Sequence, residues 1–308
     1  MKNKNIILHI GLHKCGSTTL QQNFLNMNNK DYKFFYKYNK LQNYLKFPNN
    51  KIKKEIQREI NETKEPNIII SNEGAFGHQA NGFVDVNNRL KILDDLFNKP
   101  KYIIFFREPS ALIYSFYNFS LKKGITTNFV DYTSTNINLL NKRINLNNSM
   151  GTNYKVYNYN IIFNDYLKIC NRVLFLEFEE FFINKSKKEY DKFYNFIGKN
   201  LNFITIKKYN KSIKNLIYIP FYKNYFLLNF FKSFFSISII RWYLNIFNIK
   251  YWDVISLFIY LFNIFNKNEI VKSVDQFNQK HLQEIMNYHQ DNYLLFKKRI
   301  NLIIKSLE

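Results

Sequence analysis

The chain has 308 residues, of which 46% are hydrophobic and 19% aromatic, with 45 Lys and Arg against 23 Asp and Glu, a formal net charge of +22. This composition excludes a wholly disordered chain, and the length is sufficient for a substantial core. Two cysteines are too few for a disulfide-rich scaffold or a four-thiolate metal site, and the positive charge favours anionic ligands.

Short apolar segments alternate with longer amphipathic ones over residues 5–200, a pattern typical of a parallel α/β sheet. Near-continuous apolar runs such as IILHI, NIIIS and YIIFF predict strands that are covered on both faces. The predicted strands are Asn5–Gly11, Tyr32–Tyr36, Asn67–Ser71, Lys101–Phe106 and Arg172–Glu177. The predicted helices are Ser17–Asn29, Lys51–Thr63, Val86–Asn98, Pro109–Lys123 and Lys187–Ile197.

The composition changes near residue 205, and Phe226–Phe265 is dense in aromatic and aliphatic side chains. Its longest uncharged run, Val254–Asn266, has 13 residues, whereas a membrane-spanning helix needs about 20. Two interpretations stay open: core helices of a C-terminal subdomain, or a basic surface that faces an acceptor or a membrane. Ser273–Glu308 predicts a long amphipathic helix. We expect a core domain over residues 1–215 and a helical, aromatic-rich extension over 216–308.

The first predicted strand runs into a glycine-bounded loop, GLHKCGSTTL, which leads into the first predicted helix. Such a junction presents backbone N–H groups and the positive end of the helix dipole to an anion. The loop superficially fits the nucleotide-triphosphate motif G-x4-G-K-[ST], but Lys14 lies inside the loop and Ser17 stands where that motif requires lysine. The fourth strand also ends in Arg107 and not in a magnesium-binding Asp, which disfavours a kinase.

A second cluster of polar residues follows the fourth predicted strand. Arg107 lies at the carboxyl end of that strand, where ligands of open α/β sheets bind, and a guanidinium binds phosphate bidentately. Pro109 suits the first turn of a helix, and Ser115 lies about two turns further along it. The two clusters together predict a site for a ligand with two anionic groups.

These residues resemble the motifs of sulfotransferases that use 3′-phosphoadenosine 5′-phosphosulfate (PAPS). The loop Lys14-Cys15-Gly16-Ser17-Thr18 resembles their K-[TS]-G-[TS]-T motif, and Arg107-x7-Ser115 with Pro109 and Tyr117 resembles R-[DE]-P-x5-S-x-Y. The segments 70–76 and 173–198 are similar to further parts of the family pattern, so the resemblance covers residues 5–215. It implies a P-loop-type three-layer α/β fold, with a central parallel sheet flanked by helices and a mainly helical C-terminal extension.

The resemblance also implies an activity: in-line transfer of a sulfuryl group from PAPS to a hydroxyl of a carbohydrate or glycolipid, without a metal. Lys14 would bind the phosphosulfate and stabilise the leaving phosphate, while Arg107 and Ser115 would hold the 3′-phosphate. The remaining donor-binding residues would be Cys15, Gly16, Ser17, Thr18 and Thr19.

The acceptor hydroxyl needs a general base, which in the family is a His or Glu. Glu73 is the first choice because it follows the third strand, and His78 and His13 are reserves. His9 alternates inside a buried strand and is expected in the core.

The sequence departs from the family pattern at two positions and lacks one further element. Cys15 replaces the commoner Thr or Ser, and a thiol at a helix N-terminus can have a lowered pKa. Phe178 stands where some relatives have Tyr. The basic element that completes the 3′-phosphate site in several relatives is not visible, although Lys207, Lys208 and Lys211 lie in the corresponding region.

Two alternatives remain from other classes: a P-loop nucleotide kinase, and a non-enzymatic basic protein that binds membranes or nucleic acid. For the sulfotransferase we expect no nucleic-acid partner. The N-terminus lacks a signal-peptide pattern, which predicts a cytoplasmic enzyme. The acceptor would then be a sugar precursor, such as a lipid-linked glycan of a bacterial surface polysaccharide, reached at the inner face of the membrane.

Overall fold

A computed structural model describes residues 4–25, 30–36, 38–77, 82–122, 129–134, 152–198 and 270–307. The chain divides into two compact units. The first comprises Met1–Leu112, Lys155–Lys211 and His289–Glu308, and the second comprises Ile113–Tyr154 and Ser212–Tyr288. The predicted boundary at residue 215 and the aromatic segment 226–265 lie outside the described residues.

The first unit is built on a five-stranded sheet in the order β2-β3-β1-β4-β5, and every neighbouring pair is parallel. The strands are β1 (Asn5–Gly11), β2 (Tyr32–Tyr36), β3 (Asn67–Ser71), β4 (Lys101–Phe106) and β5 (Val173–Glu177). All five predicted strands are therefore confirmed; the last begins one residue late because Arg172 closes a 3₁₀ turn. Since β3 and β4 lie on opposite sides of β1, the chain reverses its strand order there, and parallel sheets bind ligands beside such a reversal.

The predicted helices are present with small differences in their ends. They appear as α1 (Ser17–Leu25), α3 (Asn50–Glu62), α4 (Val86–Phe97), α5 (Pro109–Lys122), α10 (Lys187–Ile197) and α14 (Ile270–Leu307). Sequence reasoning missed one amphipathic helix, α2 (Asn39–Lys46), which buries Leu41, Tyr44 and Leu45. It also missed short turns, which are η1 (Glu73–Ala75), α6 (Phe129–Thr133), η3 (Tyr154–Val156), α8 (Tyr159–Ile162), α9 (Asn164–Lys168), η4 (Cys170–Arg172) and the π-helical η5 (Glu179–Ile183).

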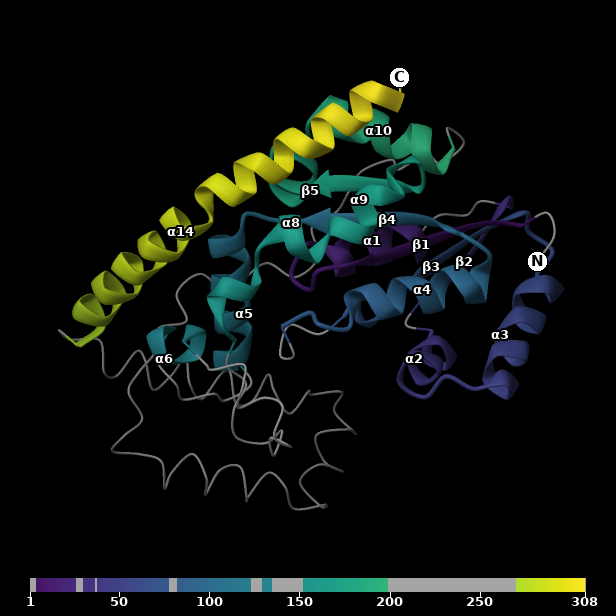
Figure 1. Cartoon of the computed structure of the whole chain (residues 1–308), viewed down its shortest axis with the longest axis horizontal. Coiled ribbons are helices and arrows are strands. Elements are labelled where there is room, and N and C mark those ends of the chain that lie inside the picture. The colour runs from purple at the N-terminus through teal and green to yellow at the C-terminus, as the bar shows by residue number, and fades with distance from the viewer. Residues whose placement is uncertain are drawn as a thin grey trace, which may run out of the picture. The chain divides into compact units, whose positions relative to one another are not determined.

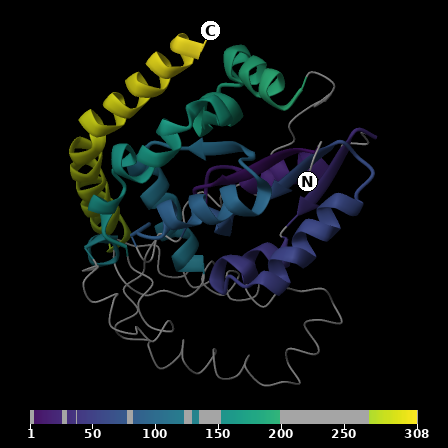
Figure 2. The ribbon, with the colours of Figure 1, turned by 45° about the vertical axis from the view of Figure 1, so that its right-hand side comes forward.

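Helices lie over both faces of the sheet (Figure 1; Figure 2), and the contacts of alternating β4 side chains identify them. On one face, the Phe105 ring packs against Phe181 and Phe182 of η5, and α1 and α10 meet through Phe24 and Phe193. On the other face, Tyr102 donates to Asp94 of α4 and packs on α9, while Phe106 packs on α8 and on Phe296 of α14. The expected three layers, helices over both faces of a parallel sheet, are confirmed.

The described part of the second unit has an aromatic centre. Tyr117 of α5 packs against Phe129 and Tyr132 of α6, and Thr133 lies 2.9 Å from a ring nitrogen of His281 in α14. Across the described residues, no helix is both long and apolar enough to cross a membrane.

Candidate functional site

The loop between β1 and α1 holds the predicted anion-binding residues in a constrained backbone. Lys14 has φ 67°, which is a left-handed conformation. This conformation is unfavourable for a residue other than glycine, and such residues are often found at functional sites. Gly16 has φ +81°, and a Cβ at that position would lie 2.5 Å from Cε2 of Phe182. Helix α1 begins at Ser17, so its first amides have no partner within the helix. The loop thus has the geometry of an anion cradle.

Glu73 and His13 form a pair at the carboxyl ends of β3 and β1. His13 Nδ1 lies 2.6 Å from Oε2 of Glu73, and both side chains are partly buried. Burial raises the pKa of the Glu73 carboxyl, but the hydrogen bond and charge of His13 and a hydrogen bond from Ser17 lower it below its ordinary value. Glu73 is therefore a carboxylate at neutral pH, able to accept a proton.

His9 lies deeper in the sheet and is only 1% exposed, as expected. Its Nδ1 lies 2.7 Å from the Ser71 hydroxyl, which also accepts a hydrogen bond from Gln21 at 2.9 Å. Burial lowers the pKa of His9 to about 4, against a smaller opposing effect of Glu73. His9 is thus a neutral core residue.

Arg107 follows β4 and is held at several points. Its Nε donates to Oε1 of Glu179 at 2.8 Å, and its Cζ lies 4.6 Å from the centre of the Phe178 ring. The Tyr159 hydroxyl donates to the Arg107 carbonyl at 2.6 Å. Burial raises the pKa of Glu179, although the charge of Arg107 partly offsets this. The guanidinium is therefore fixed at the same edge of the sheet as the loop after β1.

A lowered pKa of the Cys15 thiol, which its place at a helix N-terminus suggested, is wrong. The Cys15 side chain is fully buried, and burial raises the pKa of its thiol well above the ordinary value, with a smaller opposing effect from Arg107. Cys15 is consequently an unreactive thiol that packs in the core.

The other predicted residues fall in three groups. Ser17 and Thr19 are buried, whereas Gly16 and Thr18 are partly exposed in the loop and first turn of α1. Ser115 is the seventh residue of α5, partly exposed and within the second unit, so the structure does not place it against Arg107. The reserve base His78 and the lysines 207, 208 and 211 lie outside the described residues.

Sequence reasoning missed Glu179 and Tyr159 as partners of Arg107. The sequence offered only a weak signal for Glu179, which lies two residues after β5, the strand that pairs with β4. The pairing depends on the register of β4 and β5, in which Phe106 lies opposite Glu177.

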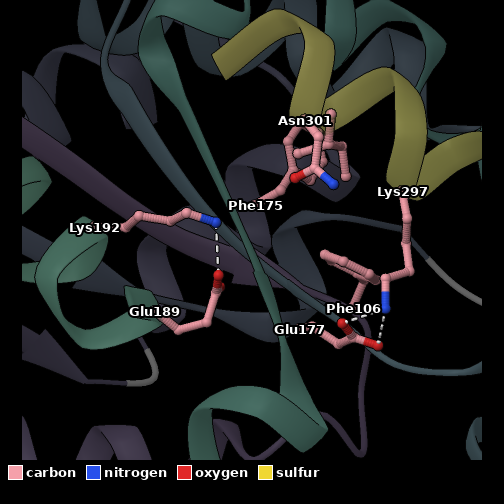
Figure 3. A pocket seen from close by; sticks show the side chains of 8 residues that line it. Phe106, Phe175, Glu177, Glu189, Lys192, Lys297 and Asn301 are labelled. Atoms are coloured by element: carbon pink, nitrogen blue, oxygen red, sulfur yellow. Dashed lines mark hydrogen bonds and ion pairs between the residues drawn. The ribbon is translucent and has the colours of Figure 1, made fainter. Parts of the chain in front are cut away.

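A small pocket of about 50 Å³ beside β5 is lined by other residues. Figure 3 shows Lys297 reaching Glu177 and Lys192 reaching Glu189, so the charges in this pocket neutralise one another. None of its lining residues belongs to the predicted site. Within the part of the chain that the structure describes, no group of three His, Cys, Asp or Glu side chains could hold a metal ion.

The fold is that of a P-loop-type α/β protein: a parallel sheet in the order 2-3-1-4-5, with a glycine-containing loop after its central strand and an arginine after the next strand. Residues 4–230 match the model of the sulfotransferase domain family. The chain belongs to this family and is an enzyme of sulfuryl transfer.

A sulfotransferase from Alicyclobacillus acidocaldarius is similar at 14% identity and a TM-score of 0.44, covering 77% of this chain and 92% of its own. Mouse sulfotransferase SULT7A1 complexed with PAP is similar at 14% identity and a TM-score of 0.40, covering 74% of this chain and 75% of its own. The search of curated proteins found no match.

Proposed function

We propose that the protein transfers a sulfuryl group from PAPS to a hydroxyl of a carbohydrate or glycolipid acceptor. The observation that supports this most is the placement of Lys14, Glu73 and Arg107, which follow three adjacent strands, β1, β3 and β4, at the carboxyl edge of one parallel sheet. This arrangement offers two cationic groups for a doubly anionic nucleotide and one carboxylate for the acceptor proton.

PAPS supplies a sulfuryl group that is activated by its bond to a phosphate. The acceptor oxygen forms the new S–O bond while the bridging S–O bond breaks, and Glu73 takes the hydroxyl proton at its carboxylate. Lys14 neutralises the negative charge that develops on the departing phosphate, and the loop amides around Gly16 hold that phosphate in place. Arg107 and Ser115 are the proposed ligands of the 3′-phosphate.

The acceptor class and the cellular location are proposals of the same kind. The region 207–272 carries 10 Lys and Arg against 2 Asp and Glu, and much of it is aromatic. Such a composition is suited to the surface of an anionic membrane. We propose a cytoplasmic enzyme that works at the inner face of the membrane on a lipid-linked glycan.

Activity on a glycolipid in anionic vesicles should then exceed activity on the same glycan free in solution. Equal activity on both would contradict the membrane role.

The nucleotide is tested by isothermal titration with 3′-phosphoadenosine 5′-phosphate (PAP), beside ADP and ATP with and without magnesium. We expect PAP to bind without metal and more tightly than either of the others. Arg107→Ala should abolish that preference, whereas Arg58→Ala should not, since Arg58 is an exposed residue of α3 that pairs with Glu62 of the same helix. A preference for ATP with magnesium would contradict PAPS as the donor.

A further inference from the structure

The side chain of Arg107 contacts two residues, Phe178 and Glu179, whose pairing with it the sequence did not predict. Glu179 accepts from Nε at 2.8 Å, and the Phe178 ring lies 4.6 Å from Cζ. The side chains of the ion pair are 20% and 28% exposed, so the pair is shielded from water more than a surface pair.

The contact with Glu179 leaves the opposite edge of the guanidinium for a ligand. Among the described residues, none accepts a hydrogen bond from the two terminal nitrogens of Arg107. Those two nitrogens form the fork that binds two phosphate oxygens at once. A carboxylate on Nε thus fixes the direction of the fork without occupying it.

The turn that carries Glu179 is anchored by its other residues. It opens the π-helical turn η5, and such turns are frequent at functional sites. Two residues before it, Glu177 is bound by Tyr293 at 2.6 Å and by Lys297 at 2.7 Å, both from α14. Later in the same turn, Phe182 packs on Phe105 and lies against Gly16 of the anion loop. The turn therefore contacts both anion-binding elements, the loop after β1 and the arginine after β4.

We propose that Glu179 is a positioning residue, which orients the guanidinium of Arg107 for the 3′-phosphate and thereby sets the preference for nucleotides that carry this group. The inference rests on the proposed function, because it takes PAP as the ligand of Arg107. A flexible arginine loses side-chain freedom when it binds phosphate, and an arginine already held by Glu179 and Phe178 loses less.

The test compares two nucleotides that differ only in the 3′-phosphate, PAP and AMP, by isothermal titration. Glu179→Ala should weaken PAP binding by about tenfold, the lower end of what removing the partner that orients a metal ligand costs at metal sites, and leave AMP binding unchanged. Glu179→Gln, which keeps an oxygen for Nε, should restore most of the affinity for PAP. In an Arg107→Ala background, Glu179→Ala should have no further effect, because the group that it orients is gone.

Glu180→Ala is the matched control, since Glu180 lies in the same turn but pairs with the exposed Asn184. An equal loss for PAP and AMP would show a merely structural role, and tighter PAP binding would show a carboxylate that competes with the phosphate; either result overturns the proposal. Should Glu179→Ala fail to fold, Glu179→Asp, which draws the carboxylate away from Nε, must give the same selective loss. If the wild-type protein does not bind PAP, the proposed function fails before this inference is reached.

Discussion

Glu73 and His13 are the pair on which catalysis depends in the proposed reaction. They lie 2.6 Å apart, and the lowered pKa of Glu73 keeps its carboxylate ionised at neutral pH. Burial raises the pKa of the Glu73 carboxyl, and the contacts with His13 and Ser17 outweigh that effect and lower it. The same contacts keep the side chain in place for an incoming hydroxyl.

Glu73→Gln should reduce sulfuryl transfer by at least about 100-fold, the scale expected when a general base is removed. PAP affinity should change by less than about threefold, since an amide keeps the size of the side chain and Glu73 is not assigned to the nucleotide. The measurement is kcat with a PAPS donor beside titration with PAP. Glu62→Gln, on the exposed end of α3, is the control; retained turnover in Glu73→Gln would move the base elsewhere.

His9 makes the stability of the protein depend on pH. Its pKa is about 4 in the folded protein and 6.5 when exposed, so the unfolded chain binds a proton between these values that the folded chain does not. Stability therefore falls as pH decreases through this window. From pH 7 to pH 5, the free energy of unfolding should fall by about 2 kcal/mol through His9 alone.

The check is urea denaturation at both pH values for the wild-type protein and for His9→Gln, which cannot titrate. The variant should lose about 2 kcal/mol less than the wild type between pH 7 and pH 5. Identical losses in the two proteins would assign the pH dependence to other groups.

At the scale of elements, the last turns of α14 are part of the core of the first unit. Phe296 is fully buried, and its ring packs against Phe106, Tyr159, Phe163 and Phe175. The same helix supplies Tyr293 and Lys297 to Glu177, at the end of β5. A segment near the C-terminus thus supports the strand that leads into Glu179.

Phe296→Ala should lower the free energy of unfolding by about 3–5 kcal/mol, the usual cost of removing a large buried ring. Leu302→Ala on the same helix should cost less than about 0.5 kcal/mol, because Leu302 is 58% exposed. Denaturant titration of both variants distinguishes them. Equal effects would mean that α14 does not pack on the sheet as described.

At the scale of the whole molecule, the net charge of +22 creates a positive field that favours the binding of anions such as the proposed nucleotide. Salt shortens the range of this field: the Debye length is about 10 Å at an ionic strength of 0.1 M and about 3 Å at 1 M. The ion pairs of Arg107 and Lys297 are partly buried, so they are screened less than the exposed lysines.

PAP binding should therefore weaken as salt rises from 50 to 500 mM, and more steeply than AMP binding, because PAP carries the larger negative charge. Titrations of the two nucleotides over this range measure the two slopes. Equal slopes would show that the surface charge contributes little and that local contacts decide nucleotide binding.

Local patterns in the sequence determined the strands, most helices and the anion loop. Apolar runs such as IILHI can be satisfied only inside a covered sheet, and the loop from Gly11 to Thr18 has its conformation prescribed by adjacent residues. These features depend on neighbours in the chain, so they can be inferred without a fold. Cys15 shows the limit: its place in the loop was predictable, but its full burial and raised pKa were not.

Only the tertiary structure decided which distant residues meet. The register of β1 and β3 places His9 opposite Ser71 and so brings His13 to Glu73, 60 residues away. The register of β4 and β5 brings Arg107 to Glu179, 72 residues away. Strand register and helix packing are set by the burial of whole faces and not by local sequence. The sequence by itself therefore determined which residues are candidates for the site, while the packing of the sheet decided which distant side chains contact them.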